Sequence, residues 1–226
     1  MILNTFNLSL KQIEQFNKYY KFLIEENQKY NLTSIIDRKE VYIKHFYDSL
    51  AACFTLDFFK INNYCDIGSG GGFPAIPLKV VFPHLKLTVV EPTKKKILFL
   101  QRLCDLLQIS DIEFINQRAE NFILNRREYY DLVSARAVAV LPVLLELVLP
   151  FLKVGGIFIA YKGSNYYEEQ KASGNALKIL FSVIENIYEY QLPENMGQHA
   201  IIKIRKQRET ELVYPRRYAQ IKKKHL

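Results

Sequence analysis

Two patterns of hydrophobic and polar residues divide the chain near residue 60. In the first part, Ser9 and Gln12 form a capping-box pair, and apolar residues then recur at helical spacing. These apolar residues are Leu10, Ile13, Phe16, Tyr20 and Leu23. A second helix is expected to start with Asp37 and to run to about Phe54. Residues 1–60 are therefore predicted to form a helical extension, rich in Phe and Tyr, that packs on the rest of the chain.

From Asn63 onward, short apolar runs alternate with amphipathic stretches. The predicted strands are Tyr64–Ile67, Leu85–Val90, Ile112–Ile115, Asp131–Ser134 and Ile157–Tyr161. The predicted helices are Pro74–Val81, Thr93–Gln108, Val140–Leu152 and Tyr166–Leu180. This alternation predicts an α/β fold with a parallel sheet covered by helices on both faces. Two later runs, Val183–Leu192 and His199–Ile204, predict a hairpin at one edge of the sheet.

Charge is distributed unevenly along the chain. Of the net charge of +8, residues 203–226 carry +7, with nine basic and two acidic residues. This asymmetry favours a polyanionic partner at the C-terminal end, although a tail that only aids solubility is an alternative. The remaining composition, 49% hydrophobic and 24% charged, is that of a globular protein. We expect a core at residues 61–206 and a basic tail at 207–226.

Several classes of protein are disfavoured by what the sequence lacks. The three cysteines have no Cys-x-x-Cys spacing, and Cys65 and Cys104 are predicted to pack in the core. The four histidines lack metal-ligand spacing, so no metal is expected. The N-terminus does not resemble a signal peptide, and the most apolar region, Val138–Tyr161, is interrupted by prolines and charges. A reduced, cytoplasmic setting without membrane contact is therefore expected.

The segment Cys65–Pro74 joins a predicted strand to a predicted helix and is rich in glycine. Glycines at such a junction let the backbone approach a ligand closely and present N–H groups to it. Phe73 replaces the third glycine of the dinucleotide-binding fingerprint. With Asp66 ahead of the glycines, the spacing is instead the Asp-x-Gly-x-Gly-x-Gly form typical of methyltransferases. It predicts cofactor contacts at Asp66, Gly68 and Gly70; a purely structural loop is the alternative.

Polar residues follow the next three strands, at the sheet edge where ligands bind in such folds. Glu91 ends the second strand and is predicted to accept the ribose hydroxyls of an adenosine, although it could be a solvated strand-end charge. Ala119 and Glu120 follow the third strand, where the adenine is usually held. Arg136 follows the fourth strand in an apolar stretch and needs a partner. It could form a structural salt bridge, or it could face the cofactor and a nucleic acid.

Two clusters of cations are candidates for phosphate contacts. Lys94, Lys95 and Lys96 open a predicted helix, where each opposes the helix dipole by about 0.3–1 kcal/mol. A sequence tends to break such a rule at a functional site, but tolerated surface charge is an alternative. Near the end of the chain, Arg216 and Arg217 follow a tyrosine and a proline. Arginine binds phosphate through its planar fork, and tyrosine can stack on an exposed base.

The ordered set of motifs resembles the bacterial 16S rRNA guanine-N7 methyltransferases, the methyltransferase G family, from about Tyr30 to Tyr214. The motifs are Tyr30–Ser34, His45–Ser49, the glycine-rich segment through Pro77, Glu91–Lys96, Arg118–Glu120, Ser134–Ala137, Lys162–Gly163 and Tyr214–Arg217. The edge hairpin fits this resemblance. So does the lack of an Asn/Asp-Pro-Pro-Tyr/Phe motif or a Pro-Cys pair, since a ring nitrogen with a free lone pair requires neither device.

The resemblance implies a Rossmann-like class I fold that binds S-adenosylmethionine. It implies methylation of N7 of guanine 527, in the 530 loop of 16S rRNA, by a monomer. Its implied cofactor contacts are Gly68, Phe73, Ala119, Glu120 and Arg136. Arg118 and Arg136 join the two cation clusters as candidates for holding RNA.

This chain departs from the family at two positions. Glu91 stands where members usually carry Asp, and Pro92 stands where many carry a small or polar residue. The first changes reach without changing charge, and the second removes a backbone N–H. Three other functions stay open on sequence alone. They are a nicotinamide-dependent oxidoreductase, a non-catalytic RNA-binding or ribosome-assembly module, and a methyltransferase for another substrate.

Overall fold

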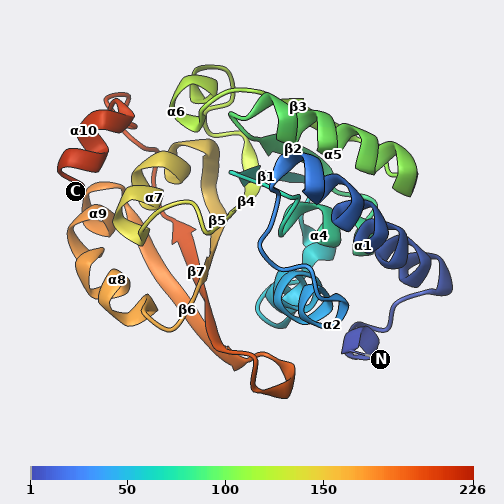
Figure 1. The fold of residues 1–226 in the computed structure, drawn as a ribbon. Helices are drawn as coiled ribbons and strands as arrows, with labels where there is room; N and C mark the ends of the chain where they lie inside the picture. The colour runs from blue at the N-terminus through green and yellow to red at the C-terminus, as the bar shows by residue number, and fades with distance from the viewer. Residues whose placement is uncertain (1) are drawn as a thin grey trace.

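A seven-stranded sheet forms the centre of the computed structural model, which describes residues 2–226 (Figure 1). Its strands are β1 (Asn63–Ile67), β2 (Lys86–Val90), β3 (Ile112–Ile115), β4 (Tyr130–Arg136), β5 (Leu152–Lys162), β6 (Ser182–Gln191) and β7 (Gln198–Lys206). The strand order is β3-β2-β1-β4-β5-β7-β6. Strands β1 to β5 pair in parallel, and β7 lies antiparallel between β5 and β6. The predicted parallel sheet and edge hairpin are both confirmed.

Helices connect the strands and cover both faces of the sheet. They are α4 (Ala75–Val81), α5 (Lys94–Leu107), α6 (Ala119–Phe122), α7 (Leu141–Val148), α8 (Tyr166–Ala172) and α9 (Gly174–Ile179), with α10 (Tyr218–Lys223) at the C-terminus. Two predicted helices differ from the structure. The helix expected to reach Leu152 ends earlier, because Leu152 already belongs to β5. The helix expected over 166–180 divides at Ser173, whose hydroxyl bonds to the Glu169 carbonyl oxygen at 2.7 Å.

The N-terminal part is helical, as predicted. Helix α1 (Leu10–Tyr30) begins with the expected capping box, in which Ser9 and Gln12 bond each other's backbone N–H. The second helical run has four parts: α2 (Arg38–Glu40), a π-helical segment η2 (Val41–Tyr47), α3 (Asp48–Leu50) and a 3-10 turn η3 (Ala51–Phe54). Shorter 3-10 segments are η1 (Ile2–Phe6), η4 (Phe58–Lys60), η5 (Ile123–Asn125), η6 (Leu149–Phe151) and η7 (Pro193–Asn195). π-Helical turns occur frequently at functional sites.

The hydrophobic core lies on both faces of the sheet. Helices α1, α4 and α5 lie on one side and α7, α9 and α10 on the other (Figure 1). Cys65 and Cys104 are buried, as expected. On α1, Tyr19 is fully buried whereas Leu10 is 86% exposed, so placing Leu10 on the apolar face was wrong. Phe16 and Leu23 share a core with strand residues, which explains how the helical extension is held. Within residues 2–226, no helix combines the length and hydropathy needed to span a bilayer.

The sheet topology fixes where a ligand can bind. Strands β1 and β4 are neighbours, and their connections leave from the same edge of the sheet, since the strands are parallel. Open α/β sheets bind ligands at the carboxyl ends of the strands, where the strand order reverses. In this sheet the reversal lies between β1 and β4, next to the glycine-rich segment.

Candidate functional site

The glycine loop, Gly68–Gly72, joins β1 to α4 at this edge. Three of its residues have left-handed backbone conformations, with φ of +76° at Gly68, +57° at Gly70 and +99° at Gly72. A Cβ atom at Gly72 would lie 2.5 Å from the Tyr19 hydroxyl oxygen, so this glycine serves packing. A Cβ atom at Gly70 would meet only the Gly68 carbonyl oxygen, at 3.9 Å. The loop therefore leaves open space at Gly70, which fits a cradle for a ligand.

Asp66 lies beneath the glycine loop and has no exposed surface. Its two carboxylate oxygens accept hydrogen bonds from the hydroxyls of Ser69 and Ser134. Burial raises its pKa to about 7, although the two serine hydrogen bonds act in the opposite direction. Asp66 thus ties the loop to β4, and its predicted cofactor contact stays a prediction.

Glu91 links the glycine loop to the next helix. One carboxylate oxygen accepts from the Gly70 N–H at 3.1 Å, and the other accepts from the Thr93 N–H at 2.9 Å. A carboxylate has about four lone-pair sites, so each oxygen can still accept a ligand hydroxyl. The Asn116 amide donates to the carbonyl oxygens of Glu91 and Pro92, which fixes the end of β2 against β3. Sequence reasoning did not identify Asn116 as a site residue, because an asparagine by itself does not indicate a particular role.

Phe73 has a packing role that the sequence did not reveal. Its ring is 6% exposed and lies between the rings of Tyr19 and His45, with centroid distances of 5.4 Å and 4.4 Å. The Arg136 guanidinium carbon lies 5.3 Å from the same ring. The side chain is therefore enclosed by protein, and little of it is left for the predicted cofactor contact.

Arg136 forms the structural salt bridge that the sequence left open. Its guanidinium donates to Asp48 Oδ2 at 2.6 Å, to the Lys44 carbonyl oxygen at 3.1 Å and to His45 Nδ1 at 2.8 Å. Because Nδ1 accepts this bond, Nε2 of His45 carries the proton and donates to the Thr33 hydroxyl at 2.8 Å. Burial and the Arg136 charge lower the pKa of His45 to about 3, so this imidazole is neutral.

Asp48 is the centre of this network and is also buried. Besides Arg136, it accepts hydrogen bonds from the Tyr190 hydroxyl at 2.6 Å and from His199 Nδ1 at 2.7 Å. Burial acts to raise its pKa, but the His199 hydrogen bond and the Arg136 charge outweigh it and lower the pKa. Asp48 therefore stays ionised and joins the N-terminal helical run to β4 and to the edge hairpin.

The predicted adenine residues lie at the start of α6. Ala119 is 7% exposed, and Glu120 is half-buried with no hydrogen bond or ion pair within residues 2–226. The exposed Arg118 precedes them, and its guanidinium carbon lies 5.7 Å from the Tyr218 ring centroid. Arg118 thus connects this region to the C-terminal helix α10.

The lysine cluster is solvated. Lys94 and Lys95 are exposed and Lys96 is half-buried at the start of α5. None of the three has an ion-pair partner in the described part of the chain. The cluster is therefore free for an external anion, and its predicted role in phosphate binding stays a prediction.

The basic tail is attached to the core rather than free. Glu146 is fully buried and accepts from Arg216 Nε at 2.8 Å, from its terminal nitrogen at 2.6 Å and from its backbone N–H at 2.9 Å. Arg127 donates to the carbonyl oxygens of Thr210, Glu211 and Tyr214. The Arg216 guanidinium is therefore engaged, which speaks against its predicted contact with RNA phosphate. Arg217 is exposed and remains a candidate.

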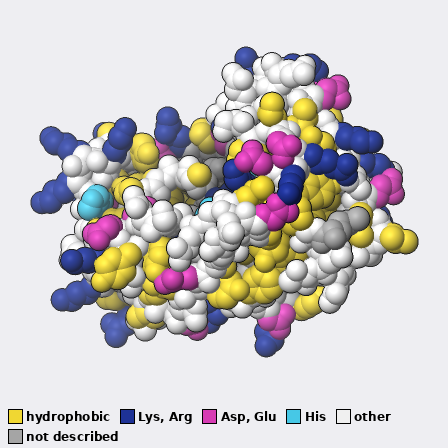
Figure 2. Space-filling view, turned by 60° about the horizontal axis from the view of Figure 1, so that its bottom comes forward, with side chains coloured by type: hydrophobic (Ala, Val, Ile, Leu, Met, Phe, Trp, Pro, Cys, Tyr) yellow, Lys and Arg dark blue, Asp and Glu magenta, His cyan; other side chains and the backbone are white. Residues whose placement is uncertain are grey.

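In Figure 2, lysine and arginine side chains gather along the left-hand edge, the side on which α8, α9 and α10 lie in Figure 1.

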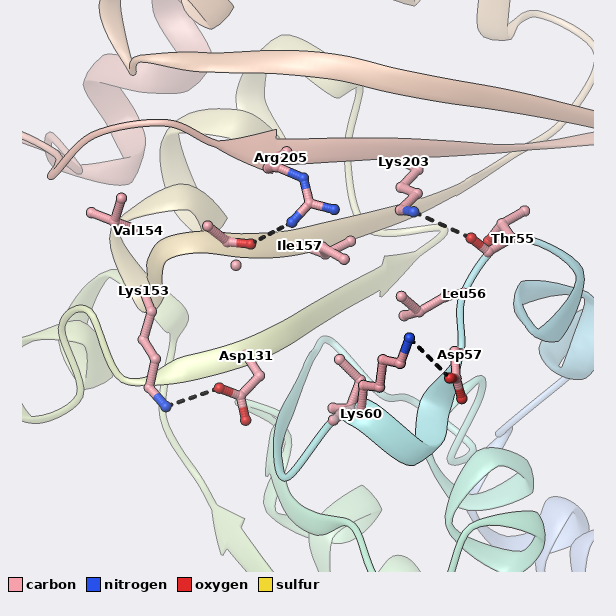
Figure 3. Close-up of a pocket in the computed structure, with 13 residues that line it drawn as sticks. Thr55, Leu56, Asp57, Lys60, Asp131, Lys153, Val154, Ile157, Lys203 and Arg205 are labelled. Carbon is pink, nitrogen blue, oxygen red and sulfur yellow. Dashed lines mark hydrogen bonds and ion pairs between the residues drawn. The ribbon is translucent and has the colours of Figure 1, made fainter.

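Two cavities of similar volume differ in their position relative to the sheet. A cavity of about 500 Å³ lies where β4 begins and β5 turns into the sheet, away from the glycine loop (Figure 3). Its charged residues are paired: Lys153 with Asp131, and Lys60 with Asp57. A second cavity of about 400 Å³ lies beside Arg136, where β4 and β5 end. Position therefore favours the second cavity as part of the site.

Besides Asn116, the structure adds three residues to the site that sequence reasoning did not assign: His45, Asp48 and His199. The first two fall in the His45–Ser49 motif, which was noted without a role, and His199 stood in no noted motif. Within residues 2–226, no group of three or more His, Cys, Asp or Glu side chains is arranged to hold a metal ion.

The chain matches the family model described as rRNA small subunit methyltransferase G (GidB) over residues 12–215. A ribosomal RNA small subunit methyltransferase G from Bacillus licheniformis is 47% identical over 213 residues, covering 93% of this chain and 89% of that protein. The protein of the same name from Bacillus subtilis is 46% identical, with the same coverage.

Solved structures show the same fold at low sequence identity. M. jannaschii TYW2, in complex with AdoMet, has a TM-score of 0.58 and 14% identity, covering 76% of this chain and 79% of that chain. The ribosomal protein L11 methylase of Lactobacillus delbrueckii subsp. bulgaricus has a TM-score of 0.56 and 15% identity, covering 73% and 79%. These likenesses show that the sheet of this chain belongs to the same Rossmann-like α/β fold.

Proposed function

The chain belongs to the rRNA small subunit methyltransferase G family, and from this we propose that it methylates N7 of guanine 527 in the 530 loop of 16S rRNA. The observation that carries the proposal is the family match over residues 12–215, which includes the whole sheet. The methyl donor is S-adenosylmethionine. We further propose that the protein acts as a cytoplasmic monomer.

The residues present fit this cofactor. The space at Gly70 lets a ligand approach the loop backbone, and the Glu91 carboxylate lies hydrogen-bonded to that loop. We assign Gly68, Gly70 and Glu91 to the methionine and ribose parts, and Ala119 with Glu120 to the adenine. Glu120 has no partner within residues 2–226, which leaves its carboxylate available. Asp66 and Phe73 would act mainly by holding the loop, because both Asp66 oxygens accept from serine hydroxyls and the Phe73 ring is stacked on Tyr19 and His45.

Methyl transfer to guanine N7 requires little from the protein beyond binding and orienting the two reactants. S-adenosylmethionine supplies a methyl group activated on a sulfonium sulfur. Guanine N7 carries a free lone pair at neutral pH, so no side chain has to remove a proton. Holding two reactants in line can supply roughly 7–11 kcal/mol of the barrier. We therefore assign the catalysis to alignment and exclusion of water, with Arg136 holding the walls of the site in place through Asp48 and His45.

We assign RNA binding to two solvated groups of cations. Lys94, Lys95 and Lys96 lie at the start of α5, directly after Glu91 and Thr93, and they have no internal partner in the described residues. Arg118 and Arg217 are also exposed. Such contacts would fix the RNA through its phosphates, while the target base is unstacked from its loop and enters the site.

The test uses purified protein, methyl-labelled S-adenosylmethionine, and either 30S subunits or deproteinised 16S rRNA. We expect label at guanine 527, detected as N7-methylguanine by reduction and strand scission. Label at another nucleotide or in protein would contradict the assigned substrate. Binding of cofactor and RNA without any transfer would instead favour a non-catalytic assembly role.

A further inference from the structure

The cavity beside Arg136 is lined by separate segments of the chain that lie far apart in the sequence. The helical run contributes His45 and Asp48, the end of β4 contributes Arg136, the end of β5 contributes Gly163, and the edge hairpin contributes His199. Its volume, about 400 Å³, lies within the range of small-molecule sites, roughly 300–1,000 Å³. A cavity of this kind has room for one nucleobase.

One wall of this cavity lies next to the glycine loop. The Arg136 guanidinium carbon lies 5.3 Å from the ring of Phe73, which directly follows the loop. Val138 lies so close to Gly68 that an added Cβ atom would be 2.5 Å from Val138 Cγ2. Between them, Ala137 lines the cavity with a left-handed φ of +56°, a conformation that costs a non-glycine residue about 1–2 kcal/mol. The cavity thus adjoins the proposed cofactor cradle across a single strained turn.

Most polar groups around the cavity are already partnered. Arg136 is paired with Asp48, Lys162 with Glu169, and Lys44 with Glu40. His199 is the exception. Its Nδ1 bonds the Asp48 carboxylate, whereas its Nε2 makes no hydrogen bond within residues 2–226. A carboxylate only accepts, so Nδ1 donates this bond, and Nε2 is left without a partner in the described part of the chain; in the neutral form of the ring it is an acceptor.

We propose that this cavity receives the target guanine and that His199 Nε2 accepts a hydrogen bond from the N1–H and N2–H₂ edge of the base. This inference rests on the proposed function. Enzymes that modify an unstacked base commonly read its Watson–Crick edge. The opposite edge carries N7, which such a contact leaves free for methyl transfer. Adenine has no N1–H, so the same acceptor discriminates against it.

The first test fills the cavity without straining the backbone. Gly163 lines the cavity, and a Cβ atom there meets nothing within 4 Å. Gly174, at the start of α9 and outside the cavity, is equally open and serves as the matched control. We expect Gly163→Trp to lower kcat/KM for 30S subunits at least tenfold, with the Kd for S-adenosylhomocysteine within twofold of the wild type. Gly174→Trp should change neither.

Three outcomes separate this proposal from the proposed function. If the wild-type protein transfers no methyl group to 16S rRNA, the proposed function fails. If the wild type is active and Gly163→Trp stays within threefold of it, the cavity does not receive the base. If Gly163→Trp weakens the binding of S-adenosylhomocysteine more than tenfold, the cavity binds the cofactor, and the proposal is again overturned.

The second test separates reading of the base from support of Asp48. Tyr190→Phe removes a different donor from the same Asp48 oxygen and so measures the cost of weakening this network. His199→Ala should lower kcat/KM for 30S subunits at least tenfold further than Tyr190→Phe does, through KM for RNA and not through cofactor affinity. Equal losses in the two variants would mean that His199 only supports Asp48 and does not contact the base.

Discussion

The ion pair between Arg216 and Glu146 offers a quantitative test of how the tail is held. Glu146 is fully buried, and the Arg216 side chain is 25% exposed. Arg216→Ala removes the two side-chain hydrogen bonds to Glu146, of 2.8 Å and 2.6 Å, and one of 3.1 Å to the Lys224 carbonyl oxygen, but it keeps the backbone N–H bond of 2.9 Å. Breaking a buried pair costs about 3–5 kcal/mol. The surviving backbone bond favours the lower end, about 3 kcal/mol, which lowers Tm by about 6–12 °C in a chain of this size.

The assay is calorimetric or fluorescence-monitored unfolding of three variants. Arg217→Ala, at an exposed neighbouring position, should change the stability by no more than about 0.5 kcal/mol. Combining Glu146→Gln with Arg216→Ala should recover at least half of the loss, because it removes the unpaired buried charge. A Tm decrease below about 2 °C for Arg216→Ala, or no recovery in the double variant, would refute the reasoning. RNA titrations at several salt concentrations test the proposed phosphate contact of Arg217: Arg217→Ala should lower the slope of log affinity against log salt by about 0.7.

Three further predictions concern the cofactor site. Glu91→Gln loses a charge-assisted acceptor worth about 1.5–3 kcal/mol, so calorimetry should show at least tenfold weaker binding of S-adenosylhomocysteine. A loss of affinity of less than threefold would mean that another residue binds the ribose. Gly68→Val should abolish cofactor binding while thermal unfolding stays cooperative. The added Cβ atom would lie 2.5 Å from Val138 Cγ2 and must displace the loop that holds the cofactor. Calorimetry showing unchanged affinity for S-adenosylhomocysteine would contradict this. The folded-state pKa of Asp66, about 7, lies above its ordinary 3.8, so the folded protein binds the extra proton between these values. The stability of the wild type relative to Asp66→Asn should therefore fall as pH rises from about 4 to about 7, and a difference independent of pH in denaturant unfolding would refute this.

Hydrophobic periodicity was sufficient to predict the sheet and most of its helices. Each strand of the structure overlaps a predicted run, because buried parallel strands and amphipathic helices differ in period. The errors arose where side chains act on the local backbone. Ser173 interrupts a predicted helix by bonding a carbonyl oxygen, and the π-helical turn over Val41–Tyr47 has no signature in residue type. Leu10 showed the right period but lies too near the helix start to be covered.

The site was predicted less completely than the fold. The positions of Gly68, Gly70 and Glu91 follow from the strand ends, and the structure brings them together. Asp48 could not be identified in this way, because its partners lie 88 residues away at Arg136 and 151 residues away at His199. The ion pair of Arg216 could not be predicted for a similar reason. Its basic neighbours indicated an external anion, whereas its partner Glu146 lies 70 residues earlier in an apolar helix.

The most direct test of the account is mass spectrometric mapping of 16S rRNA from cells that contain this protein and from cells that lack it. A third strain should carry the Gly68→Val variant as a matched control. The account predicts N7-methylguanine at position 527 only in cells with the wild-type protein. An unmodified guanine 527 in those cells, or the same methylation in all three strains, would contradict it.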